Sequence, residues 1–126
     1  FRGIGDLKVT LVSSTFNMVF RVAAAAVCVL GDGPVVSFMD GATIYDRALY
    51  RMARETADEN GIPSQTKTAI AGGNDAGALQ QAGQGSAALA VSLPCRYIHS
   101  GASVVQQSDI DATRALLAAL LPKLYD

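Results

Sequence analysis

The feature that most constrains this chain is an apolar run that ends at a proline and is followed by its only histidine. Small apolar residues fill positions 87–91, and Pro94 then lacks the backbone N–H that a paired strand needs. We therefore expect a buried strand that ends at Pro94. Ligands of open α/β sheets bind beyond the carboxyl ends of the strands. The first candidate site is accordingly formed by Arg96, Tyr97 and His99.

Two environments are open for the His99 ring. In one, the loop follows a central strand, one ring nitrogen faces a cleft, and the other nitrogen is held by a hydrogen-bond acceptor. In the other, the ring is enclosed and bonded to backbone groups, with Arg96 and Tyr97 covering it. A lone histidine beside a tyrosine is more often structural than a metal ligand. The position of the loop beyond Pro94 favours the cleft.

Composition excludes several classes of function. Ten basic and eleven acidic residues leave the chain almost neutral without a basic cluster, so nucleic acid is not an expected partner. Cys28 and Cys95 lack C-x-x-C spacing, which favours a reducing, cytoplasmic location. The apolar run from Met18 to Leu30 contains Arg21 and is shorter than the roughly 20 residues that cross a bilayer. We expect no membrane anchor and, without a basic leader, no signal peptide.

Hydrophobic periodicity predicts one α/β domain over residues 1–126. Strands are expected at 7–12, 16–22, 35–39, 65–70 and 87–93, while 23–26 fit either a helix or a strand. One helix should bury Ile44, Ala48, Leu49, Met52, Ala53 and Ala57, and the last should bury Ile110, Thr113, Leu116, Leu117, Leu120 and Leu121. The order of elements predicts a layered domain with a mixed, partly parallel sheet flanked by helices.

Capping residues predict where these helices begin and end. Asn60-Gly61 is typical of a left-handed C-terminal cap, and either Asn74 or Asp75 can cap the next helix. The S-x-x-D pattern of residues 108–111 predicts the start of the last helix, and Pro122 predicts its break or kink before Leu124.

The turn Gly72-Gly73-x-x-x-Gly77 lies between a predicted strand and a predicted helix, as a phosphate-binding turn would. It is not G-x-G-x-x-G, however, and neither Lys-Ser/Thr nor the expected acidic residue follows it. We interpret it as a tight turn with close backbone packing.

Two motifs together resemble a known family. Gly72-Gly73-Asn74-Asp75-Ala76-Gly77, followed by a short helix, a strand and Ser92-Leu93-Pro94-x-Arg96-Tyr97-Ile98-His99-Ser100, resembles the C-terminal part of the catalytic domain of glutamyl and tetrahedral aminopeptidases. These enzymes are cocatalytic metallopeptidases. The resemblance covers residues 30–126, with further landmarks in 30–34 and 61–65, while residues 1–29 match poorly.

The resemblance implies a site and its partners. In this family the histidine of the last motif binds one of two zinc or cobalt ions, which share a bridging carboxylate and activate a water molecule. His99 inherits the role of metal ligand. The residues expected to line the site are Gly73, Asn74, Asp75, Arg96 and Tyr97, of which Asn74 stands where the family usually has threonine. A peptide substrate and a homo-oligomer are implied as well.

The chain also departs from the family pattern. It has no second histidine and no adjacent glutamates, and no acidic residue lies between Asp6 and Asp32, where a further ligand is expected. One imidazole cannot hold two metal ions, and no residue matches the general base. Two functions therefore stay open. The chain is the C-terminal part of a metal-dependent aminopeptidase acting on short peptides, inactive in isolation, or it is a non-catalytic α/β scaffold or assembly module.

Overall fold

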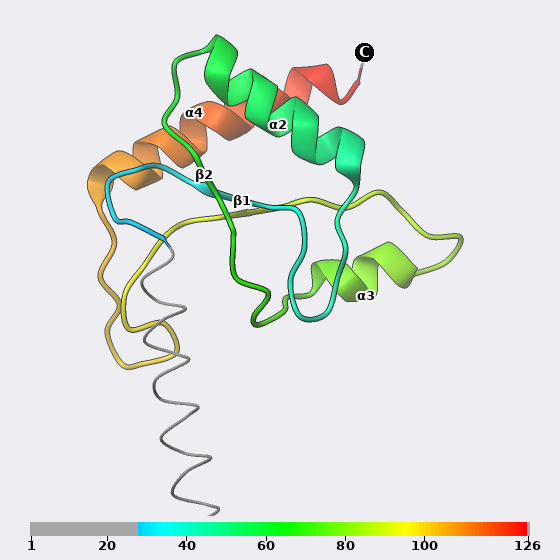
Figure 1. The fold of residues 1–126 in the computed structure, drawn as a ribbon, viewed down its shortest axis with the longest axis horizontal. Coiled ribbons are helices and arrows are strands. Elements are labelled where there is room, and N and C mark those ends of the chain that lie inside the picture. The colour runs from blue at the N-terminus through cyan, green and yellow to red at the C-terminus, as the bar shows by residue number, and fades with distance from the viewer. Residues whose placement is uncertain (1–27, 126) are drawn as a thin grey trace, which may run out of the picture.

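The computed structural model describes residues 28–125 (Figure 1). Three strands and three helices alternate along the chain. They are β1 (Val35–Ser37), α2 (Arg47–Glu59), β2 (Gln65–Thr66), α3 (Ala76–Gln81), β3 (Ala90–Ser92) and α4 (Gln107–Lys123). The strands expected at 7–12 and 16–22, and the ambiguous residues 23–26, lie outside the described part.

The three strands form one mixed sheet in the order β2-β1-β3. β1 runs parallel to β2, with Val35 opposite Gln65, and antiparallel to β3, with Val36 opposite Val91. The predicted fold class, a layered α/β domain with a partly parallel sheet, is confirmed. Among the described strands β1 is the central one and β3 lies at an edge. The expectation that the His99 loop follows a central strand stays a prediction, because the strands predicted at 7–12 and 16–22 lie outside the described residues.

All three strands are shorter than predicted, and for β1 side-chain hydrogen bonds show why the pairing ends early. After β1, the Asp40 carboxylate accepts the N–H groups of Ala42 and Thr43, each at 2.8 Å, and this turns the chain. Met39 then pairs with Ile44 in an isolated bridge and not with another strand.

The core lies between one face of the sheet and the helix pair α2 and α4 (Figure 1). Val36 of β1 is fully buried and packs with Leu116 and Leu120 of α4. Two alanines of α2, Ala53 and Ala57, are also fully buried. Their small side chains let α2 approach the strand closely, and removal of this apolar surface from water is the main stabilising contribution.

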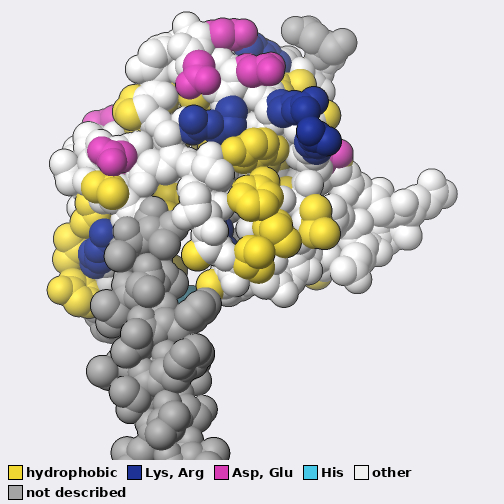
Figure 2. Space-filling model, in the orientation of Figure 1, with side chains coloured by type: hydrophobic (Ala, Val, Ile, Leu, Met, Phe, Trp, Pro, Cys, Tyr) yellow, Lys and Arg dark blue, Asp and Glu magenta, His cyan; other side chains and the backbone are white. Residues whose placement is uncertain are grey.

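The predicted apolar face of α2 is only partly correct. Ala53 and Ala57 are buried, but Ile44 is 72% exposed because the helix begins three residues later, at Arg47. Asp46 caps it by accepting the N–H of Leu49 at 2.9 Å. Ala48 is exposed as well. Figure 2 shows hydrophobic side chains gathered next to Arg and Lys side chains on the face in view.

The C-terminal end of α2 follows the prediction. Asn60 is the capping residue, and Gly61 adopts the left-handed conformation with φ +62°. The side-chain amide of Asn60 also donates to the carbonyl of Thr56 at 2.8 Å. These bonds satisfy carbonyl groups that a helix end leaves without partners.

The inward face of α4 is rotated relative to the prediction. Leu116 and Leu120 are buried as expected, but Ile110, Leu117 and Leu121 are exposed, and the remaining buried positions are Asp109 and Ala112. The predicted cap at 108–111 is also wrong, since the capping residue is Gln106 and makes no side-chain capping bond. The helix includes Pro122 and ends at Lys123, as the proline predicted.

Asp109 explains why α4 is rotated. Its fully buried carboxylate accepts the N–H of Gly31 at 3.0 and 2.9 Å and the N–H of Gly33 at 2.9 Å. This contact ties the first turn of α4 to the turn that precedes β1. Gly33 has φ +82°, and a Cβ there would lie 1.9 Å from the carbonyl oxygen of Pro63. The carboxylate therefore binds a turn that requires glycine.

Within residues 28–125, none of the helices combines the length and the apolar character that crossing a membrane would require.

We predict that Asp109→Ala lowers the free energy of unfolding by about 2–4 kcal/mol, because the buried N–H of Gly33 and the partly buried N–H of Gly31 lose their acceptor. Urea denaturation followed by circular dichroism measures this. The matched control is Asp111→Ala in the same turn of α4, an exposed position that should change stability by less than about 0.5 kcal/mol. Equal effects of the two substitutions would contradict the role of Asp109.

Candidate functional site

The candidate histidine lies in a tight loop that leaves β3. Arg96 and Val104 close the loop, since each N–H donates to the other's carbonyl at 2.9 and 3.1 Å. Inside it, the Ser100 N–H donates to the carbonyl of Tyr97 at 3.2 Å. Tyr97 and His99 both have positive φ, 60° and 63°, a conformation that costs free energy for residues other than glycine. The loop therefore has a defined, strained backbone.

The structure decides between the two environments proposed for His99 only in part. The ring is exposed, so the enclosed alternative is wrong. Arg96 and Ile98, its neighbours in the loop, line a cavity, but His99 does not belong to that lining. The assignment of His99 as a ligand that faces a cleft stays a prediction.

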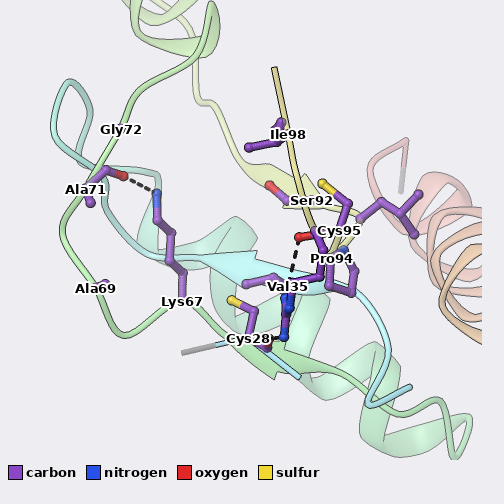
Figure 3. Close-up of a pocket in the computed structure, with 12 residues that line it drawn as sticks. Cys28, Val35, Lys67, Ala69, Ala71, Gly72, Ser92, Pro94, Cys95 and Ile98 are labelled. Atoms are coloured by element: carbon purple, nitrogen blue, oxygen red, sulfur yellow. Dashed lines mark hydrogen bonds between the residues drawn. The ribbon is translucent and has the colours of Figure 1, made fainter. Parts of the chain in front are cut away.

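The cavity has a volume of about 310 Å³ (Figure 3). Its walls come from segments 67–72 and 92–98, together with Cys28 and Val35. Successive side chains of a strand point to opposite faces of a sheet. Because Val36 packs against the helices, Val35 and the cavity lie on the face away from them.

Two cationic side chains reach the cavity. The Lys67 ammonium donates to the carbonyl of Ala71 at 2.7 Å, which Figure 3 shows as a dashed line, and the Arg96 guanidinium donates to the carbonyl of Cys28 at 2.9 Å. Burial raises the pKa of the Cys28 thiol, and the positive charges of Lys67 and Arg96 offset part of that rise. Cys28 and Cys95 are both free thiols.

The Gly72-Gly73 turn packs directly against the turn that follows β1. The N–H of Gly41 donates to the carbonyl of Gly72 at 2.7 Å, and a Cβ on Gly73 would lie 2.9 Å from the Cβ of Ala42. A Cβ on Gly77 would lie 2.5 Å from the hydroxyl oxygen of Thr43. These distances confirm the interpretation of close backbone packing, because larger residues would push the two turns apart.

A polar network, which sequence reasoning missed, joins the same two turns. The Tyr45 hydroxyl donates to the Asp40 carboxylate at 2.5 Å, and the Asn74 amide donates to the Tyr45 hydroxyl at 3.0 Å. Asp40 and Tyr45 are both about 95% buried. Asn74 also accepts the N–H of Ala76 at 2.9 Å, so it supplies the side-chain bond at the start of α3, whereas Asp75 is the capping residue without one.

Ionisation of Asp40 depends on this network. Burial alone would raise the pKa of the Asp40 carboxyl, but the hydrogen bonds from Tyr45, Ala42 and Thr43 and the charge of Lys67 outweigh burial and hold the pKa below its usual value. Burial and the Asp40 carboxylate raise the pKa of Tyr45, although the bond from Asn74 opposes this. The pair is therefore an ionised carboxylate that accepts from a neutral phenol.

The structure brings the two sequence motifs together at one cavity, but only through some of their residues. Gly72 and Arg96 line the same cavity. Gly73, Asn74, Asp75 and Tyr97 are exposed and lie outside its lining. Their assignment as site-lining residues stays a prediction.

The described residues do not fit a metal site by themselves. Within residues 28–125, no three side chains of His, Cys, Asp or Glu are grouped so that they could hold an ion. A zinc site needs three or four protein ligands. A metal bound by His99 would thus need ligands from outside this part of the chain.

Comparison with known proteins identifies the family. The sequence profile described as M42 glutamyl aminopeptidase matches residues 10–116 of the chain. The chain belongs to this family. The match contains both motifs and the whole described sheet, so the resemblance to this family is confirmed. The match begins at residue 10, however, so the expectation that residues 1–29 match poorly is wrong for residues 10–29.

Relatives of this M42 chain agree with that assignment. A putative aminopeptidase of Acetivibrio thermocellus is 33% identical over 71% of the chain and 28% of its own length. The lysyl aminopeptidase of Pyrococcus furiosus is 35% identical over 75% of the chain and 27% of its own length. Among solved structures, the TET1 peptidase of Pyrococcus horikoshii is 36% identical, with a TM-score of 0.66 over 74% of the chain and 27% of that structure. The chain thus spans about 28% of the length of the curated relatives it matches.

We predict that Tyr45→Phe lowers the free energy of unfolding by about 1–3 kcal/mol at pH 7, because the ionised Asp40 loses a buried donor. The pKa of Asp40 is lower in the folded than in the unfolded chain, so its ionisation stabilises the fold above about pH 4. This contribution is lost as the pH falls through the folded pKa. The difference between wild type and variant should therefore shrink in acid.

The matched control for this prediction is Tyr50→Phe. The Tyr50 hydroxyl bonds the hydroxyl of Thr66 at 2.8 Å, so this hydrogen bond involves no carboxylate. Chemical denaturation at pH 7 and at pH 3 measures both variants. A pH-independent difference for Tyr45→Phe, like that expected for Tyr50→Phe, would contradict the proposed coupling.

Proposed function

We propose that this chain forms the C-terminal part of the catalytic domain of an aminopeptidase that removes N-terminal residues from short peptides. The observation that carries the proposal is the family match over residues 10–116, which includes the loop of His99. The named relatives are aminopeptidases, and the chain spans little more than a quarter of their length. The proposed reaction therefore depends on residues beyond those described.

We assign His99 the role of a ligand for zinc or cobalt, with the other ligands supplied from outside residues 28–125. Its ring is exposed, so it is free to meet a partner surface. Left-handed residues other than glycine persist only when the surrounding structure holds them, and such residues cluster at functional sites. The strained backbone of Tyr97 and His99 supports this role.

A non-catalytic scaffold is the second candidate. The Asp40–Tyr45–Asn74 network and the Asp109 contact organise the turns without need of a metal. The absence of a three-ligand group among residues 28–125 fits this alternative equally well. Metal binding and hydrolysis separate the two functions.

We predict that the purified 126-residue chain retains much less than one zinc or cobalt ion per chain and does not hydrolyse amino-acid 4-nitroanilides above background. A single matched ligand cannot hold two metal ions. Metal content by mass spectrometry and release of nitroaniline, with and without chelator, measure this. Chelator-sensitive hydrolysis that His99→Ala abolishes and Ser103→Ala leaves intact would contradict the prediction.

A chimera then tests the role of the chain in the complete enzyme. Residues 30–116 replace the matched segment of the Pyrococcus furiosus lysyl aminopeptidase, and folding is checked by circular dichroism. The peptidase proposal expects chelator-sensitive hydrolysis that His99→Ala removes and Ser103→Ala, in the same loop, preserves. A folded chimera without activity would favour the scaffold.

We also propose that the chain self-associates through the outer face of α4. Leu117, Leu121 and Leu124 are exposed there and border two apolar grooves of about 480 and 460 Å³. Exposed apolar patches of this kind are typical of interaction surfaces. The TET1 peptidase of Pyrococcus horikoshii is described as assembling into a tetrahedron or a large octahedral shell. The assembly of this relative supports the proposal that the present chain self-associates.

We predict that the chain forms dimers or larger particles at tens of micromolar, measured by size-exclusion chromatography with light scattering. Leu121→Glu should shift the distribution toward monomer, because it places a charge in the apolar face. Ala115→Glu, an exposed position of α4 outside both grooves, is the control and should leave the mass unchanged. A monodisperse wild-type monomer would contradict the proposal.

A further inference from the structure

We propose that the cavity between segments 67–72 and 92–98 binds small organic acids. In this proposal the Arg96 guanidinium binds the carboxylate, Lys67 adds a second positive charge to the cavity, and the apolar walls hold the hydrocarbon part. The binding needs no metal and no hydrolysis, so it does not depend on the aminopeptidase function.

The charge of the cavity is the first argument. Lys67 and Arg96 are the charged residues in its described lining, which contains neither Asp nor Glu. Both side chains are half-buried and make their hydrogen bonds to backbone carbonyls: Lys67 to Ala71, and Arg96 to Cys28 and Cys95. The ion pair found within residues 28–125 lies elsewhere, between Lys123 and Glu59. Partly desolvated cations without a carboxylate favour an anionic ligand.

The buried carboxylate of Asp40 interacts electrostatically with Lys67, but it does not occupy the cavity in place of a ligand. Lys67 contributes to the lowered pKa of Asp40. The Asp40 oxygens, however, are bonded to Tyr45, Ala42 and Thr43, and Asp40 does not line the cavity. Within residues 28–125, Lys67 uses one of the three donors of its ammonium, in the bond to Ala71.

Geometry and surface chemistry specify the kind of anion. A guanidinium presents a planar fork of donors that matches a carboxylate, and two of its five N–H groups are used by Cys28 and Cys95. The rest of the wall is largely apolar, with Val35, Pro94 and Ile98 among its residues (Figure 3). A carboxylate with a hydrocarbon body meets both surfaces, whereas inorganic phosphate would leave the apolar wall uncovered.

The size of the cavity limits the ligand. A volume of about 310 Å³ is at the lower end of the range for small-molecule sites. An acid with one ring or a short chain fits this space. Phenylacetate is therefore a suitable probe, and phenylacetamide, which has the same shape without the charge, is its matched control.

Isothermal titration calorimetry on the 126-residue chain tests the proposal. Phenylacetate should bind at least about tenfold more tightly than phenylacetamide, because a charge-assisted hydrogen bond is replaced by a neutral one. Inorganic phosphate should not compete at equal concentration. Equal binding of the acid and the amide, or binding of phosphate without phenylacetate, would overturn the proposal.

Variants locate the binding. Lys67→Met keeps the length of the side chain and removes its charge, and it should weaken phenylacetate binding about tenfold. The control is Lys123→Met, which removes a cation that is paired with Glu59 away from the cavity and should leave binding unchanged. Unchanged binding in Lys67→Met would overturn the assignment.

A second measurement on the unaltered chain keeps the test decisive if a variant fails to fold. Cys28 and Cys95 are free thiols in the cavity lining, so a bound ligand should shield them. Phenylacetate should slow their alkylation by iodoacetamide, followed residue by residue with mass spectrometry, while phenylacetamide at the same concentration should not. Equal alkylation rates with both compounds would count against the cavity as the binding site.

Discussion

The contact on which the structure most depends is the buried carboxylate of Asp109. It accepts two backbone N–H groups of the turn that precedes β1, and it comes from the first turn of α4, nearly 80 residues later in the chain. The carboxylate therefore sets the position of α4 relative to the central strand. Leu116 and Leu120 then reach Val36 because the helix is already aligned over it.

A buried carboxylate also organises the turn at the other end of β1. Asp40 is also a buried carboxylate that accepts backbone N–H groups, here those of Ala42 and Thr43. Tyr45 adds a hydroxyl donor, and Asn74 extends the network to the turn before α3. A strand of three residues contributes few ladder bonds of its own. Side-chain carboxylates at its entrance and exit add hydrogen bonds that hold the turns on either side of it.

The sequence predicted the elements better than their boundaries and their faces. The alternating helices and strands, the Asn60-Gly61 cap and the mixed sheet follow from periodicity and turn residues. The length of β1 and the rotation of α4 do not, because Asp40 and Asp109 read as surface charges in a sequence. Their burial depends on N–H groups that only the folded turns present. The S-x-x-D pattern of residues 108–111 predicted a helix cap that the structure does not contain. The carboxylate that fixes this end of α4 belongs to Asp109, which lies inside that pattern.

The candidate site shows the same limit. The family resemblance implied that the two motifs meet at one site, and in the structure Gly72 of the first motif and Arg96 of the second line one cavity. The motifs could not show that Lys67, from segment 67–72, lines the same cavity as Arg96, from segment 92–98, because no sequence pattern links the two residues. β1 separates two surfaces of different character: Val36 faces an apolar core, and Val35 faces a cavity that holds the two cations. Alternation along one short strand thus divides the domain into a face that stabilises it and a face that is available for a ligand.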